Sequence, residues 1–136
     1  MLLILAQFIR IDKTNPESIP ALGIIEVESA GPDIAAMLKA SCYDCHSNES
    51  KYPWYTNVAP VSWWIKNHIN SARGSLNFSE WANYSPQEKT DHANEAALKV
   101  EKKWMPISSY KIAHPEGRLS DEQVVVLSNW FKKVGE

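Results

Sequence analysis

The sequence predicts an all-α domain of about four helices. Two helix start signals, Ser85-Pro86-Gln87-Glu88 and Ser120-Asp121-Glu122-Gln123, combine a serine cap with Glu or Gln three residues later. Apolar residues follow both signals at helical spacing, and no stretch alternates in the way that a half-buried strand does. The chain of 136 residues has the length of one domain and can bury an apolar core.

The first two helices are expected around the middle of the chain. The first begins near Asp33, after the break at Gly31-Pro32, and runs into Cys42. The second opens at Pro60 and ends near Gly74, which places Trp64 and His68 on one face.

The third helix is expected from Ser85 to about Lys103, and the last begins at Ser120. Their predicted inner faces are Ala93, Ala96, Ala97 and Val100 on the third, and Val124, Leu127, Phe131 and Val134 on the last.

The N-terminal part of the chain divides into two segments before the main domain at residues 33–136. Residues 1–9 are apolar except for Gln7, and charged residues follow at once. Crossing a bilayer takes about 20 residues, so we interpret residues 1–13 as the trimmed end of a membrane anchor, with a short buried helix as the alternative. Residues 14–32 hold three of the eight prolines and are expected to form an extended linker or wrapping segment.

Composition argues against a nucleic-acid partner. Lys and Arg total 14 against 16 Asp and Glu, and no basic stripe exists for a phosphate backbone. Six Trp and five Tyr suggest a domain built around a large, flat, apolar group as well as its own side chains.

The segment Cys42-Tyr43-Asp44-Cys45-His46 contains both cysteines of the chain and predicts a covalently attached haem. Two thiols at this spacing can add to the two vinyl groups of one porphyrin, and the next residue then presents an imidazole to the iron. Three alternatives compete: a disulfide, a Cys-x-x-Cys redox motif, and a structural zinc site. The redox motif is expected beside a βαβ pattern, which is missing, and the remaining histidines do not make a zinc-type pair.

The chain resembles the bacterial haem-binding domain family of c-type cytochromes. The resemblance rests on the haem attachment motif followed by Ser47, on Tyr52-Pro53-Trp54-Tyr55, and on further matching segments at Ala59–Trp64, His68-Ile69, Leu76–Trp81, Met105-Pro106 with Tyr110, and His114-Pro115. It covers about residues 30–134. It implies a single haem c with its iron, export to the periplasm or another extracytoplasmic face, and often an N-terminal membrane anchor.

A looser similarity links the chain to class I cytochromes c. The order is shared: a helix enters the attachment motif, a Met-Pro pair comes late, and a final helix packs across the first. Two departures are Ala35 and Ala36 where those proteins usually have glycine at the helix crossing, and an aromatic-rich insert from Tyr52 to Trp81. We therefore expect a cytochrome c-like fold whose haem pocket is lined differently.

His46 is the expected axial ligand on one face of the iron, and Met105 is the predicted ligand on the other. Met105 precedes Pro106 in the loop before the last helix, in the class I order. His68 is the main alternative, and His114 a weaker one because Pro115 and Gly117 suggest an exposed turn. Arg73 is the best charged candidate for binding a haem propionate, unless it is simply an exposed helical arginine.

The expected function is single-electron transfer between extracytoplasmic redox proteins, with no catalysed reaction. The alternatives are a peroxidase-like haem enzyme, which needs an open iron position and acid/base groups, and a haem-based sensor.

Overall fold

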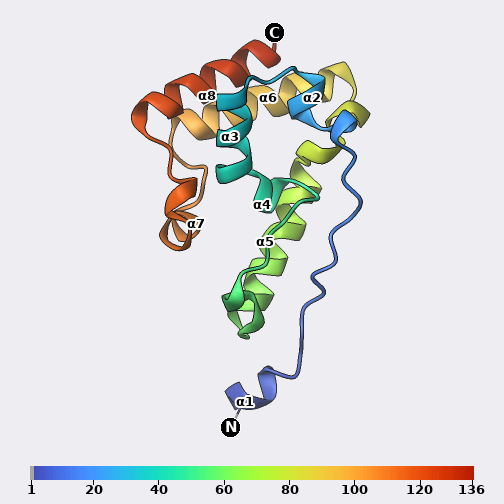
Figure 1. Cartoon of the computed structure of the whole chain (residues 1–136), viewed down its shortest axis with the longest axis vertical. Helices are drawn as coiled ribbons and strands as arrows, with labels where there is room; N and C mark the ends of the chain where they lie inside the picture. The colour runs from blue at the N-terminus through green and yellow to red at the C-terminus, as the bar shows by residue number, and fades with distance from the viewer. Residues whose placement is uncertain (1) are drawn as a thin grey trace.

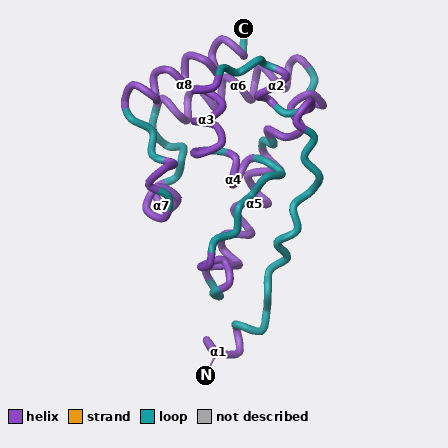
Figure 2. Tube along the Cα trace, in the orientation of Figure 1, coloured by secondary structure: helices purple, strands orange, loops and turns teal. Residues whose placement is uncertain are grey.

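The protein is all-helical, as the sequence predicts (Figures 1 and 2). The computed structural model describes residues 2–136, and within this range every regular element is a helix or a 3-10 turn. Four helices form its main body: α3 (Pro32–Ser41), α5 (Val61–Ser75), α6 (Pro86–Glu101) and α8 (Asp121–Val134).

Shorter elements connect the main helices. They are α1 (Leu2–Ala6), α2 (Ile24–Val27), α4 (Tyr43–His46), α7 (Ser108–Ala113), and the 3-10 turns η1 (Pro20–Leu22), η2 (Trp54–Asn57), η3 (Phe78–Asn83) and η4 (Pro115–Gly117). The sequence predicts a loop where α7 forms, and α7 is a short helix that spans under two turns, has no side-chain cap and buries none of its residues.

Both predicted capping boxes are present. The Ser85 hydroxyl accepts from the Glu88 amide while the Glu88 carboxylate accepts from the Ser85 amide, and Ser120 with Gln123 repeats this exchange. Each box satisfies amides at the start of a helix that no helical carbonyl can reach.

Two predicted helix ends differ slightly from the structure. Gly74 lies inside α5, and the helix stops where Leu76 becomes extended. The third helix stops at Glu101, and Lys103 takes a left-handed conformation with φ of 55°. This conformation reverses the chain, so that the amides of Trp104 and Met105 both bond back to the Lys99 carbonyl.

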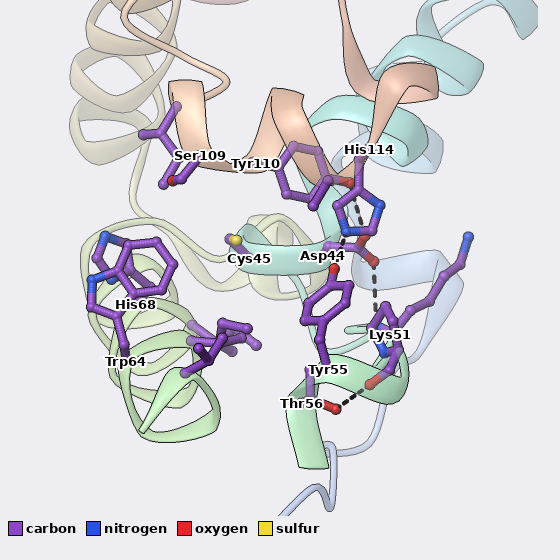
Figure 3. Close-up of a pocket in the computed structure, with 16 residues that line it drawn as sticks. Asp44, Cys45, Lys51, Tyr55, Thr56, Trp64, His68, Ser109, Tyr110 and His114 are labelled. Atoms are coloured by element: carbon purple, nitrogen blue, oxygen red, sulfur yellow. Dashed lines mark hydrogen bonds between the residues drawn. The ribbon is translucent and has the colours of Figure 1, made fainter. Parts of the chain in front are cut away.

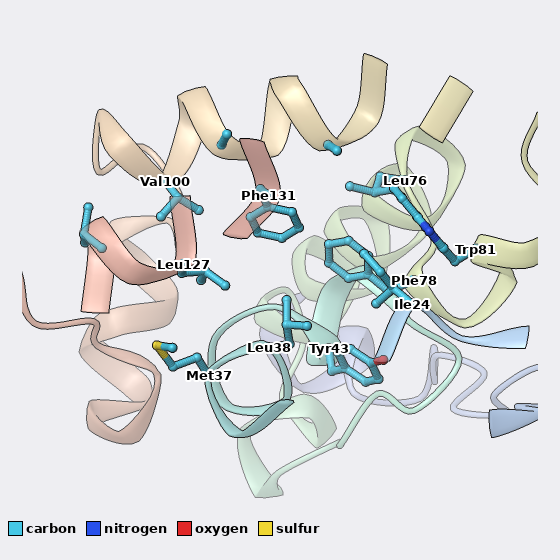
Figure 4. Close-up of a cluster of buried hydrophobic side chains, with 13 residues drawn as sticks. Ile24, Met37, Leu38, Tyr43, Leu76, Phe78, Trp81, Val100, Leu127 and Phe131 are labelled. Carbon is cyan, nitrogen blue, oxygen red and sulfur yellow. The ribbon is translucent and has the colours of Figure 1, made fainter. Parts of the chain in front are cut away.

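The core lies where α6 and α8 pack together over α3 and the η3 turn (Figure 4). Small alanines on α6, Ala93 and Ala97, are fully covered and allow α8 to approach closely. Larger side chains complete the core: Ile24, Leu38, Leu76, Phe78, Trp81, Leu127 and Phe131. Phe78, the first residue of η3, stacks on Phe131 of α8 with ring centroids 6.0 Å apart.

The N-terminal segment runs along the molecule from its far end to the core. It enters the core through Ile24, which is completely buried, while α1 lies beyond the far end of α5 (Figure 1). Among residues 2–136, no helix combines the length and apolar character needed to cross a membrane.

Candidate functional site

The attachment motif occupies the end of α3 and the whole of α4. Cys42 leaves helical geometry, with φ of −126° and ψ of −40°, and becomes both the end of α3 and the cap of α4. Its carbonyl accepts from the amides of Cys45 and His46, so a single turn holds both cysteines and the histidine. The two thiols are free and form no disulfide with each other.

Both thiols are in surroundings that keep them protonated. Burial raises the pKa of Cys42 to about 12, with a smaller contribution from Cys45. Burial and then the Asp44 charge raise the pKa of Cys45 to about 11. Redox-active Cys-x-x-Cys pairs depend on a lowered thiol pKa, so this environment argues against the redox-motif alternative.

A hydrogen bond to the main chain holds the ring of His46 in place. Its Nδ1 lies 3.0 Å from the Leu76 carbonyl oxygen, and because a carbonyl only accepts, Nδ1 carries the proton. Burial lowers the pKa of His46 and favours the neutral ring. The Nε2 atom therefore keeps an unprotonated lone pair that can bind a metal. Most metal-binding histidines are fixed in the same way, by a hydrogen bond from the ring nitrogen that does not bind the metal.

Two cavities meet at the motif, and we name each after one of its residues. The His46 cavity has a volume of about 60 Å³ and is lined mainly by Cys42, His46, Leu76, Phe78, Met105 and Phe131. The Cys45 cavity has a volume of about 280 Å³ and is lined mainly by Cys45, Trp64, Ile69, His68, Ile107 and Tyr110. Figure 3 shows the Cys45 sulfur facing the space between α5 and α7.

The two cavities lie next to each other, because residues adjacent in sequence line one cavity and the other at two places in the chain. Cys45 and His46 line different cavities, and so do Pro106 and Ile107. The motif therefore borders both spaces on one side, and the chain after Met105 borders both on the other. Apolar and aromatic side chains make most of the walls, as in sites for flat organic cofactors. A porphyrin needs two thiols, a bare imidazole nitrogen and an apolar slot, and the residues present fit it.

The structure brings Met105 together with Cys42 and His46. Met105 lines the His46 cavity, and the left-handed Lys103 that reverses the chain after α6 directs it there. His68 lines the other cavity, with its ring 4.3 Å from that of Trp64. Its Nδ1 is buried and has no hydrogen-bond partner, so the hydrogen bond that orients His46 has no counterpart at His68.

His114 was expected in an exposed turn, and this expectation is wrong. Its ring stacks on Tyr110 at 4.3 Å, Nε2 bonds the Tyr55 hydroxyl, and Nδ1 lies 2.9 Å from the Glu116 carboxylate. The turn docks on α3 because Gly117 has no side chain: a Cβ there would lie 2.9 Å from the Ala40 carbonyl. With both ring nitrogens engaged, His114 has none to offer iron.

Arg73 is also placed differently from its sequence interpretation. Its Nε donates to the Ser47 carbonyl at 2.7 Å, and its Nη2 donates to Asn15 and to Ser50. The guanidinium therefore fastens the loop that leaves His46 to the N-terminal segment, and it is neither a free propionate partner nor an exposed helical arginine.

The sequence analysis missed two lysines that line the cavities. Lys99 borders the His46 cavity and pairs with Glu95 at 2.7 Å, and Lys51 borders the Cys45 cavity. The four-residue spacing of Glu95 and Lys99 predicts an ion pair, but nothing in it predicts a position beside His46. Within residues 2–136, no three His, Cys, Asp or Glu side chains gather to hold a metal ion directly.

Comparison with known protein families matches residues 1–133 to the haem-binding domain. Searches of curated proteins and of solved structures found no match.

Proposed function

Because this chain belongs to the haem-binding domain family, we propose that it is a single-haem c-type cytochrome that passes one electron at a time between other redox proteins. The observation that carries the proposal is the geometry at the motif. A half-buried, neutral His46, whose Nδ1 is hydrogen-bonded to the Leu76 carbonyl, lies beside two free, protonated thiols. Bound there, haem supplies an iron that alternates between its ferric and ferrous states.

Cys42 and Cys45 hold the porphyrin covalently in this proposal. Each S–H would add across one vinyl double bond: a thioether C–S bond would form, the hydrogen would go to the other vinyl carbon, and nothing would be oxidised or reduced. The thiols border different cavities, which suits attachment of one flat ring at two points along its edge.

Met105 is the proposed second axial ligand. His46 would hold the iron through its other ring nitrogen, and Met105 lines the same cavity as His46 whereas His68 lines the other. A thioether ligand favours ferrous iron and raises the reduction potential relative to a second imidazole. If His46 and Met105 both bind the iron, the chain would leave no position open for a substrate, as an electron-transfer protein requires and a peroxidase-like enzyme or gas sensor does not.

We also propose an extracytoplasmic, periplasmic-type location with redox proteins as partners. Its support is the family resemblance together with Leu3, Ile4 and Leu5 of α1, whose side chains are largely exposed to solvent. An exposed apolar segment of this kind is typical of chains that meet a membrane.

The test compares the ferric absorption spectrum and midpoint potential of the haem-loaded protein with those of Met105→Ala and His68→Ala. We expect a reversible one-electron couple and a six-coordinate, low-spin spectrum in the native protein. Met105→Ala should become high-spin with a lower potential, and His68→Ala should keep the native values. A native high-spin spectrum with turnover of hydrogen peroxide would support the enzyme instead, and loss of the low-spin spectrum only in His68→Ala would move the axial role to His68.

A further inference from the structure

One end of the molecule carries an apolar surface made from two segments that are far apart in sequence. The first segment is α1 with its continuation to Ile9, and the second is the turn from Trp54 to Val61, which includes η2. We call them together the α1–η2 surface. Phe8 is 80% exposed and Trp54 76% exposed, and Ile9, Val58 and Val61 are also exposed. Large apolar patches on the surface of a protein mark sites where it binds another protein, a membrane or a ligand.

Hydrogen bonds fix these two segments to each other. The Gln7 side chain exchanges a pair of bonds with the backbone of Ala59, at 3.0 Å each. The Trp63 indole donates to the Ile9 carbonyl at 2.9 Å. The two segments therefore lie together at one end of the molecule, away from α6 and α8 (Figure 1).

Three cations lie beside this surface. Arg10 and Lys13 both donate to Asn57, at 3.2 Å and 2.6 Å, and Lys66 of α5 lies near Asp12, with its ammonium 5.8 Å from the centre of the Tyr52 ring. The acidic group there is Asp12. Its carboxylate accepts a hydrogen bond from the Thr14 amide, and this bond, with a smaller effect of the Lys66 charge, lowers the pKa of Asp12. The charge at this end is thus net positive, while the whole chain carries −2.

Exposed tryptophan and aliphatic side chains with flanking Arg and Lys match the chemistry of a bilayer with anionic headgroups. Trp settles at the headgroup level, aliphatic side chains enter below it, and the cations face the phosphates. We propose that the whole α1–η2 surface, and not α1 alone, seats the protein on such a membrane in a fixed orientation. Val61 also lines the Cys45 cavity, so this seating places the edge of that cavity beside the membrane.

The proposal concerns a surface and holds whether or not the haem carries electrons. Its first test measures binding of the haem-loaded full chain to vesicles of phosphatidylcholine with phosphatidylglycerol. Replacing Trp54 and Val58 together by serine should weaken binding about tenfold, and added salt should weaken it further. The matched control replaces Trp104 and Val125, which are similarly exposed elsewhere, by serine and should bind like the native protein.

A second test reads orientation directly. A nitroxide label is placed on Val58→Cys in the haem-loaded protein, and a control label on Lys133→Cys in α8. On adding vesicles, the label at position 58 should become accessible to oxygen and protected from a water-soluble relaxing agent, while the label at position 133 should not change. A label at position 58 that stays in water while the protein binds would mean that α1 alone attaches. Protection of that label without vesicles, with a dimer in sedimentation, would mean that a second copy covers the surface. Either result overturns the proposal.

Discussion

Replacing Arg73 should loosen the loop that leaves the attachment motif. Arg73 makes three hydrogen bonds, to the Ser47 carbonyl, the Ser50 hydroxyl and the Asn15 side chain. Ser47 is completely buried, so its carbonyl has little chance of finding water when the guanidinium is removed. Arg73→Met keeps much of the apolar stem and removes all three bonds, which isolates their contribution from packing.

The size of the effect follows from the number and burial of these bonds. A hydrogen bond to a charged group contributes about 1.5–3 kcal/mol, but two of the three share one nitrogen atom and lie in partly exposed surroundings. We therefore expect Arg73→Met to lower the free energy of unfolding by about 2–4 kcal/mol. For a chain of this size, this corresponds to a fall in Tm of roughly 8–15 °C.

Thermal unfolding of the haem-loaded protein, followed by circular dichroism at the helix band, measures this loss. Arg118→Met is the matched control, because Arg118 makes one bond, to the Lys111 carbonyl at 2.7 Å, and is exposed. The control should lose less than about 1 kcal/mol. Equal losses in the two variants would refute the role given to Arg73.

Three further predictions concern stability, each measured by unfolding of the haem-loaded protein. Burial and the hydrogen bond to Asp44 raise the pKa of Tyr110, so folded protein keeps this proton above pH about 10 while unfolded protein loses it, and stability falls as pH rises. Tyr110→Phe should therefore be less stable than native protein at neutral pH, with a gap that narrows above pH about 10, and parallel pH curves would contradict this. Ser85→Ala breaks a capping box and should cost about 1 kcal/mol, an unchanged urea midpoint being the contrary result. Phe131→Ala empties a fully buried ring position and should cost about 3–5 kcal/mol, against less than about 0.5 for the exposed control Val125→Ala.

Local signals predicted the helices and the motif well. Ser85 and Ser120 cap their helices as expected, because a capping box lies within four residues and depends on nothing distant. The attachment motif likewise fits into a single turn after α3. Such features can be predicted because the residues that form them lie next to one another in the sequence.

Contacts between distant segments could not be predicted in this way. The sequence analysis treated the six tryptophans alike, yet Trp81 is fully buried whereas Trp54 is mostly exposed. Trp81 is covered because α2 packs against η3 and Glu28 accepts from its indole at 2.6 Å, a partner 53 residues away in sequence. Spacing along one segment carries no information about such a partner.

The orientation of His46 depends on the same kind of distant contact. Its partner is a backbone carbonyl, freed where α5 ends at Leu76, and a main-chain atom leaves no trace in residue identity. The role of Arg73 was missed for a related reason, since Asn15 lies 58 residues away.

The most direct test of the central claim, a haem held covalently by Cys42 and Cys45 beside His46, is extraction of the purified, denatured protein with acidified organic solvent. The account predicts that the colour stays with the polypeptide, and that replacing Cys42 and Cys45 together by alanine abolishes this retention. Colour that leaves with the solvent, or haem content unchanged in the double variant, would contradict it.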